Sequence, residues 1–220
     1  MRELLGKEIA RKVEDGQVIG VGTGTTVESA LREIGSRVSS EKYRISVVPT
    51  SYQTAWLCEK LGFTVLSPCF GGKIAFGFDG ADAVDPKRRA IKGKGGALLQ
   101  EKILAARCEE YFIIVDENKM VDALSEACPI PVEVVPAALG IALAELRDLG
   151  AKEMTLREGS GKHGPVITEG GNLIVDAAFP KVSDTLERDI KSIVGVVESG
   201  LFSDYATAVY VATTKGVKKI

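Results

Sequence analysis

The hydrophobic and polar positions of the first 120 residues follow two alternating periods. Short, nearly continuous apolar runs typical of buried strands occur at residues 18–22, 43–50, 63–67, 73–79 and 111–117. Between them, apolar residues recur every three or four positions, which predicts helices over residues 1–16, 26–38, 52–62 and 96–107. Strands that alternate with helices predict an α/β fold, a mainly parallel sheet with helices on both faces.

A proline-rich segment, "CPIPVEVVP" at residues 128–136, marks a change in this pattern. Beyond it the order is strand–helix–strand–strand–helix–strand, with one extra hairpin strand before a Glu-Gly-Gly-Asn turn, which is typical of a ferredoxin-like α+β domain. The strongly β-forming segment 205–217 can return to the first sheet. We therefore predict a Rossmann-like catalytic domain of residues 1–128 and 203–220, and a smaller α+β ferredoxin-like domain of residues 129–202.

Composition and charge exclude several classes of function. With 45% hydrophobic and 26% charged residues the chain is typical of globular proteins, and its net charge of −2 provides no basic field for nucleic acid or an anionic membrane. No apolar run is long enough for a transmembrane helix, and the N-terminus lacks the apolar core of a signal peptide, so we expect a cytoplasmic protein.

The reactive residue types narrow the chemistry further. The four cysteines have no metal-ligand spacing and are expected to be reduced and mostly buried. The sole histidine, His163, lies in a turn-rich segment, which disfavours Ser–His–Asp and Cys–His catalysis and histidine metal sites. Trp56 and Cys108 occupy positions that favour a packing role.

Polar clusters follow four of the predicted strands directly. Because the carboxyl ends of parallel strands meet at one edge of the sheet, where ligands bind, we expect these clusters to lie on the same edge. The expected placement of all four clusters on one edge is stronger evidence for a binding site than any single motif. The clusters are "GTGTT" at residues 22–26, "PTSYQ" at 49–53, "DGADAVD" at 79–85 and "DENK" at 116–119.

Each cluster taken alone has a plain structural alternative. The glycines and threonines of "GVGTGTTV" suit a phosphate at a helix N-terminus, yet they equally suit a tight strand–helix turn with a threonine cap. Asp79 and Asp82 can hold sugar hydroxyls or a metal, or they can form an Asx-turn. Lys119 can reach an anion or remain solvated.

The segment "IKGKGGALLQEKILA", residues 91–105, joins these clusters. Lys92 and Lys94 flank Gly93, and Glu101 falls on the helix that follows. A carboxylate at this position can act as a general base. The alternative is an ordinary exposed helix glutamate that pairs with a neighbouring lysine.

Together these segments resemble the ribose-5-phosphate isomerase type A family. The resemblance spans nearly the whole chain in family order, and it is carried by "GVGTGTTV", "PTSYQTAWLCEKLG", "FDGADAVDP", "IKGKGGALLQEKILA", "FIIVDENKMV", "PVEVVP", "GNLIVDAAF" and "GVVESGLF". It implies the interconversion of D-ribose 5-phosphate and D-ribulose 5-phosphate without a cofactor or metal, by a homodimer or homotetramer. The family fold is a Rossmann-like domain with an α+β domain beside it.

The resemblance also implies residue roles. Glu101 corresponds to the proton acceptor, and Asp79, Asp82 and Lys92 are expected to assist it as catalytic residues. The remaining residues that correspond to the substrate-holding segments are Thr23, Gly24, Thr25, Thr26, Gly80, Ala81, Gly93, Lys94, Gly95 and Lys119.

One position departs from the family pattern, since Lys94 interrupts its usual glycine run. A lysine would be costly there if the backbone needs a positive φ. Two other functions share this kind of sheet-edge site, a non-enzymatic sugar-phosphate sensor and a CoA transferase that uses a glutamate nucleophile. A sensor would normally carry a DNA-binding module, and no basic helix-turn-helix segment occurs.

Overall fold

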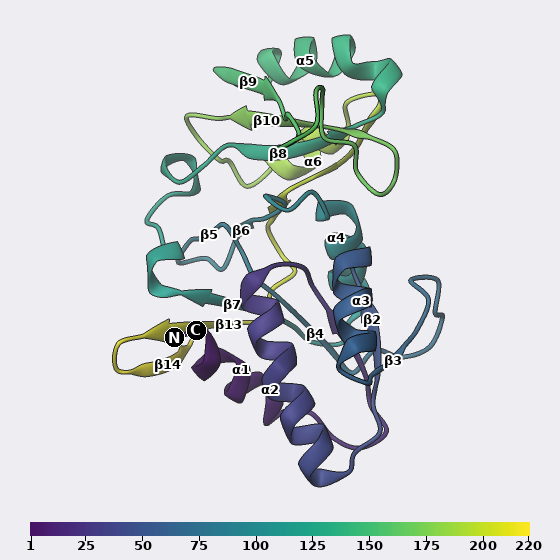
Figure 1. The fold of residues 1–220 in the computed structure, drawn as a ribbon. Coiled ribbons are helices and arrows are strands. Elements are labelled where there is room, and N and C mark those ends of the chain that lie inside the picture. The colour runs from purple at the N-terminus through teal and green to yellow at the C-terminus, as the bar shows by residue number, and fades with distance from the viewer. The chain divides into compact units, whose positions relative to one another are not determined.

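The computed structural model describes residues 1–220, which form two compact units (Figure 1). The first unit comprises residues 1–81, 100–120 and 205–220, and the second comprises residues 82–99 and 121–204. The predicted domain boundaries, at residues 128 and 203, stay a prediction.

The first unit is built on a seven-stranded sheet. Six of its strands run parallel, and only β14 pairs antiparallel, with β13. This confirms the predicted parallel sheet and the return of the C-terminal segment as β13. In spatial order the strands are β14 (Gly216–Lys219), β13 (Ala208–Thr213), β7 (Tyr111–Asp116), β4 (Phe76–Asp79), β1 (Val18–Val21), β2 (Ser46–Pro49) and β3 (Thr64–Val65).

Helices cover both faces of this sheet, as the strand–helix alternation predicts. The helices α1 (Arg2–Ala10), α2 (Thr25–Glu41) and α3 (Tyr52–Lys60) pack in the main apolar cluster on one face. On the other face α4 (Leu98–Arg107) places Leu104 against the sheet. A Cβ on Gly20 would lie 2.6 Å from a Leu104 methyl carbon, so this strand position must be glycine for α4 to approach.

The second unit contains a four-stranded antiparallel sheet with α5 (Leu139–Asp148) and α6 (Leu186–Lys191). Its apolar core joins both helices to the sheet. The strand order is the one expected for a ferredoxin-like sheet, which confirms the predicted α+β element. The strands lie in the order β11 (Val196–Ser199), β8 (Ile130–Val134), β10 (Leu173–Ala178) and β9 (Glu153–Leu156).

The extra hairpin strand predicted before β10 is wrong. Residues near Pro165 and Ile167 form only isolated bridges, to Glu158 and Leu173. Proline has no N–H to donate to a ladder, and Ile167 is 48% exposed, so this segment lacks both a full hydrogen-bond pattern and a buried face.

A small three-stranded sheet in the second unit has no counterpart in the predicted elements. It pairs β5 (Ala83–Val84), β6 (Ala90–Ile91) and β12 (Leu201–Phe202), and such two-residue strands are too short to show a period. Short 3₁₀ helices also occur, at Glu117–Lys119 (η1), Leu124–Glu126 (η2) and Pro136–Ala138 (η3).

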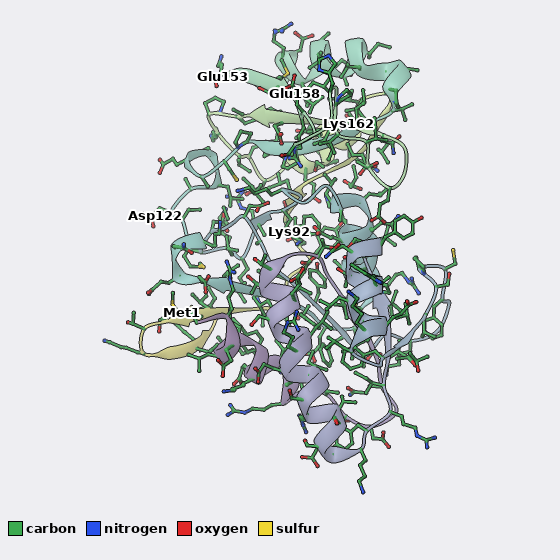
Figure 2. The ribbon with its side chains drawn as sticks, in the orientation of Figure 1. Met1, Lys92, Asp122, Glu153, Glu158 and Lys162 are labelled. Carbon is green, nitrogen blue, oxygen red and sulfur yellow. The ribbon has the colours of Figure 1, made fainter.

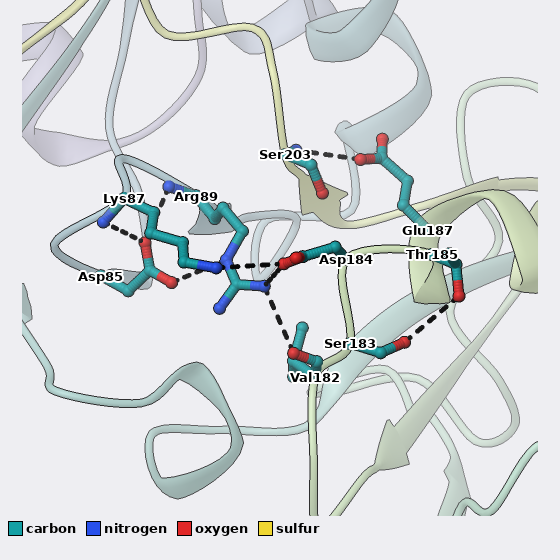
Figure 3. A network of polar contacts seen from close by, with 9 residues as sticks. All are labelled: Asp85, Lys87, Arg89, Val182, Ser183, Asp184, Thr185, Glu187 and Ser203. Atoms are coloured by element: carbon teal, nitrogen blue, oxygen red, sulfur yellow. Dashed lines mark hydrogen bonds and ion pairs between the residues drawn. The ribbon is translucent and has the colours of Figure 1, made fainter.

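A buried carboxylate closes the turn between β5 and β6 (Figure 3). Asp85 accepts hydrogen bonds from the backbone N–H groups of Lys87 and Arg89, and from the Arg89 side chain at 2.7 Å. Arg89 also pairs with Asp184 at 3.1 Å and donates to the Val182 carbonyl. These contacts fix the hairpin between Asp82 and Lys92 to the segment that precedes α6.

Several single-residue predictions have clear outcomes. Trp56 is 57% exposed and carries the Lys60 ammonium over its ring, so the predicted packing role is wrong. His163 lies exposed in a turn, as predicted.

The four cysteines are free, with Cys58 buried and Cys69 exposed. No helix has the length and apolar character needed to cross a membrane.

Candidate active site

The four polar clusters of the sequence follow neighbouring parallel strands of the first unit. In the order β7-β4-β1-β2, all strands point the same way, so their carboxyl ends share one edge. After β1 the chain adds β2 and β3 on one side, and then crosses to add β4 and β7 on the other. The segments after β1 and β4 therefore emerge at the topological switch point, where open α/β sheets bind ligands.

Asp79, at the end of β4, is fully buried and fixed by three donors. One oxygen, Oδ1, accepts the backbone N–H groups of Thr23 at 3.2 Å and Gly80 at 2.7 Å, and Oδ2 accepts the Tyr111 hydroxyl at 3.2 Å. A Cβ on Gly22 would lie 2.0 Å from the Asp79 carboxyl carbon, so only glycine permits this approach. The carboxylate thus joins the ends of β1 and β4 to Tyr111, the first residue of β7.

Tyr111 donates to this carboxylate and is also influenced by the charge of Glu101. Burial raises the pKa of the Tyr111 hydroxyl well above its ordinary value of 10.0, and the negative charges of Asp79 and Glu101 and the hydrogen bond to Asp79 raise it further. The phenol therefore stays protonated and donates to Asp79. The side chain of Glu101, in the first turn of α4, is only 3% exposed, so the alternative of an ordinary surface glutamate is wrong.

A network of hydroxyls holds the segment after β1. Thr23 Oγ1 lies 2.8 Å from the hydroxyl oxygens of both Thr50 and Ser51. Thr54 donates its hydroxyl to the Gly22 carbonyl at 2.9 Å, and its backbone N–H bonds to Ser51, the N-cap of α3. The start of α3 therefore positions the turn at Gly22 and Thr23. The polar cluster at residues 49–53 pointed to this place, but it did not identify Thr54.

The helix that follows this turn begins without a threonine cap. Gly24 is the N-cap of α2, with φ +121° and ψ 173°, a conformation that favours glycine. Thr25 and Thr26 are the first helical residues, and Thr25 is exposed. The alternative of threonine capping is therefore wrong, and the first turn of a 17-residue helix provides the positive end of its dipole here.

The second unit holds Asp82 and the lysine segment together. The backbone N–H of Asp82 donates to the Ile91 carbonyl at 2.8 Å, and the Asp82 carboxylate accepts the backbone N–H of Lys94 at 3.1 Å. Lys92, labelled in Figure 2, is 2% exposed, and its backbone N–H donates to the Gly200 carbonyl. Its ammonium lies 5.5 Å from the centre of the Phe202 ring.

Lys94 carries no backbone strain. In this segment the left-handed conformations belong to Gly93 at φ +101° and Gly96 at φ +82°, whereas Lys94 is absent from the non-glycine residues with positive φ. Its side chain is exposed. The position therefore has no conformational requirement for glycine, and the departure from the family pattern leaves the backbone geometry unaffected.

The structure distributes the predicted site residues between the two units. The first unit contains Thr23, Gly24, Thr25, Thr26, Asp79, Gly80, Ala81, Glu101 and Lys119, and the second contains Asp82, Lys92, Gly93, Lys94 and Gly95. Lys119 ends η1, directly after β7. The sequence analysis missed Tyr111, Thr54 and Arg157, which contact these residues. No group of three or more His, Cys, Asp or Glu side chains is placed to hold a metal ion.

Comparisons with known proteins agree on one family. A family model described as ribose 5-phosphate isomerase A (phosphoriboisomerase A) matches residues 46–216. Ribose-5-phosphate isomerase A of Pyrococcus abyssi is 42% identical, over 100% of this chain and 97% of the relative. The protein of that name from Treponema denticola is 39% identical, over 93% of this chain and 89% of the relative.

Solved structures give the same result. Ribose 5-phosphate isomerase A of Methanocaldococcus jannaschii superposes with a TM-score of 0.95 at 38% identity, covering 100% of this chain and 97% of that one. A D-ribose-5-phosphate isomerase in complex with phospho-erythronic acid gives a TM-score of 0.95 at 40% identity, covering 100% and 96%.

Proposed function

We propose a catalytic role for each site residue on the premise that the chain belongs to the ribose 5-phosphate isomerase A family. The protein is an aldose–ketose isomerase that interconverts D-ribose 5-phosphate and D-ribulose 5-phosphate. This reaction is a sugar-phosphate step of the pentose phosphate pathway. The observation that best supports the proposed roles is the buried group of Asp79, Tyr111 and Glu101 at the switch point of the sheet.

Glu101 is the proposed base. The isomerisation removes the proton from C2 of the aldose, forms an enediolate, and returns a proton to C1 of the ketose. A carboxylate can perform both transfers if it is within hydrogen-bonding reach of both carbons. Burial of Glu101 supports this role, because a general base works in a site from which bulk water is excluded.

Asp79 and Asp82 are proposed to orient the substrate hydroxyls. They are also proposed to help move the hydroxyl proton between O1 and O2, which accompanies the transfer between the two carbons. The donors on Asp79 support an acceptor of fixed orientation, and the Lys94 N–H fixes one oxygen of Asp82. Lys92 is proposed to stabilise the developing enediolate oxyanion, since a buried ammonium acts most strongly where water is excluded.

The turn after β1 is the proposed phosphate site. Thr23, Gly24, Thr25 and Thr26 bring hydroxyls and backbone N–H groups to the N-terminal end of α2, which favours anions. Lys119 adds a cation beyond β7. The remaining substrate contacts are assigned to the backbone of Gly80, Ala81, Gly93, Lys94 and Gly95.

Assembly and location are also proposals. The family resemblance supports a cytoplasmic homodimer or homotetramer that acts without a cofactor or metal. Sedimentation equilibrium distinguishes the two assemblies, and dialysis against a chelator tests the metal. The same resemblance supports the catalytic domain of residues 1–128 and 203–220 beside the smaller domain of residues 129–202.

Conversion in D₂O tests the proposed reaction. The protein is incubated with D-ribose 5-phosphate in D₂O and the sugar is followed by proton NMR. We expect D-ribulose 5-phosphate to form, with solvent deuterium incorporated at C1 to the extent that the base exchanges its proton. Substrate that remains unchanged at high protein concentration rejects the isomerase, and binding without conversion would favour the sugar-phosphate sensor. Full-length similarity to isomerases does not favour the sensor or the CoA transferase.

A further inference from the structure

One arginine of the second unit holds the backbone of the lysine segment. Arg157 donates from Nη1 to the carbonyl oxygens of Gly93 at 2.7 Å and Lys94 at 3.1 Å. Its Nε donates to one carboxylate oxygen of Asp176 at 2.8 Å, and Nη2 donates to the other oxygen. A single guanidinium thus joins a carboxylate to two successive carbonyls of the loop.

The pairing of β9 with β10 places Arg157 near Asp176. Arg157 follows β9 directly, just before Glu158 (labelled in Figure 2), and its backbone N–H donates to the Ile174 carbonyl of β10. In the β9–β10 ladder Asp176 faces Thr155. The side chains of Arg157 and Asp176 are only 17% and 24% exposed, so the two-point ion pair is partly desolvated. Such planar, bidentate contacts are specific to arginine.

The loop needs an anchor from outside because its own backbone provides few bonds. The Lys92 N–H still pairs with Gly200 of the neighbouring strand segment. Beyond that residue Gly93 takes a left-handed conformation, and within the loop its carbonyl accepts a backbone N–H only from Gly96. Arg157 holds the two carbonyls, while the Asp82 carboxylate holds the Lys94 N–H on the other side of the Gly93–Lys94 peptide.

We propose that Arg157 is a positioning residue for the isomerisation, and that Asp176 holds it in place. The inference rests on the proposed function, in which Lys92 and the Gly93–Gly95 backbone face the substrate. Fixing the Gly93 and Lys94 carbonyls sets the orientation of their peptide groups, and with it the direction of the Gly95 N–H and the position of the Lys92 side chain. A displacement of about 1 Å at such groups can lower a rate about 10²-fold.

The test compares steady-state kinetics of Arg157→Met with those of the unaltered chain. We expect kcat to fall at least ~10-fold while KM for D-ribose 5-phosphate changes less than ~3-fold, because placement affects mainly the transition state. Arg157→Lys keeps the charge but cannot span both carbonyls and both carboxylate oxygens, so it should recover only part of the rate. Arg188→Met is the matched control, since Arg188 is an exposed arginine paired with Asp189.

Guanidinium rescue separates positioning from general stability. Millimolar guanidinium chloride should raise the kcat of Arg157→Ala, because the free cation can occupy the vacated place between Asp176 and the carbonyls, and it should leave Arg188→Ala unchanged. Asp176→Asn offers a second route if the arginine variants fold poorly, and it should lower kcat less than Arg157→Met does.

Two results would overturn the inference. One is a kcat for Arg157→Met within twofold of the unaltered chain, and the other is a loss confined to KM. If the unaltered chain itself fails to isomerise D-ribose 5-phosphate, the proposed function fails instead, which distinguishes the two failures.

Discussion

The acidic cluster of the first unit and the lysine loop of the second unit are fixed in different ways. Asp79, Glu101 and Tyr111 stand on a strand end, a helix turn and a strand start, and the regular elements themselves set their positions. Gly93 and Lys94 lie on irregular backbone, and the side chains of Asp82 and Arg157 fix them. The acidic cluster thus stands on regular elements, whereas the lysine loop depends on polar contacts from residues distant in sequence.

The largest expected effect comes from the acidic cluster. Glu101→Gln should lower kcat at least ~10²-fold, because the amide keeps the shape but cannot accept a proton. Steady-state rates with D-ribose 5-phosphate measure the effect. Glu109→Gln is a suitable control, since Glu109 is an exposed glutamate just beyond the same helix. Near-normal turnover in Glu101→Gln would remove this residue from the role of base.

A smaller effect is expected when the link within the cluster is cut. Tyr111→Phe removes the donor to Asp79 and should lower the free energy of unfolding by about 1–3 kcal/mol, the cost of leaving a buried acceptor without that partner. Urea unfolding near pH 8 measures it, with Tyr43→Phe as the control. An unchanged midpoint would show that the hydrogen bond contributes nothing to stability.

The raised pKa of Tyr111 adds a pH dependence to this comparison. Between its ordinary value of 10.0 and the higher folded value, the folded state holds the phenolic proton while the unfolded chain releases it. The contribution of Tyr111 is therefore fully present below about pH 10, and it is lost as the pH rises further. The stability difference between the unaltered chain and Tyr111→Phe should shrink above pH 10.

The smallest effect is expected in the lysine loop. Lys94→Gly should change kcat/KM less than ~3-fold, because it removes an exposed side chain and leaves a backbone that has no positive φ. Gly93→Ala is the contrasting variant, since a Cβ there would meet Leu98 Cβ at 2.8 Å in a left-handed conformation. A tenfold loss in Lys94→Gly would mean that the ammonium contributes about 1.4 kcal/mol to the transition state.

The sequence predicted the parallel sheet and its polar edge because strands buried on both faces read as continuous apolar runs. The ends of those runs place Gly22, Thr50, Asp79 and Asp116 on one edge without any tertiary information. The same logic failed at Trp56. On α3 the buried positions are Thr54 and Cys58, four residues apart, and a side chain midway between them faces outward.

The side-chain contacts that hold the lysine loop could not be predicted from the sequence, for a different reason. Arg157 lies 64 positions from Gly93 in the sequence, and the direction of its side chain depends on the register of β9 against β10. Neither composition nor periodicity encodes that register. The two-residue strand β12 shares this property, since it exists only through its pairing with the distant β6, whereas β5 and β6 form a local hairpin.

The position of β13 has a consequence for biosynthesis. This strand comes from the last thirteen residues of the chain, yet it lies between β7 and β14, inside the finished sheet. Until residues 208–213 have left the ribosome, β7 exposes an edge that no earlier segment covers, and such edges promote aggregation. The sheet can therefore close only after residues 208–213 emerge, and a nascent chain stalled before Ala208 would be a substrate for chaperones.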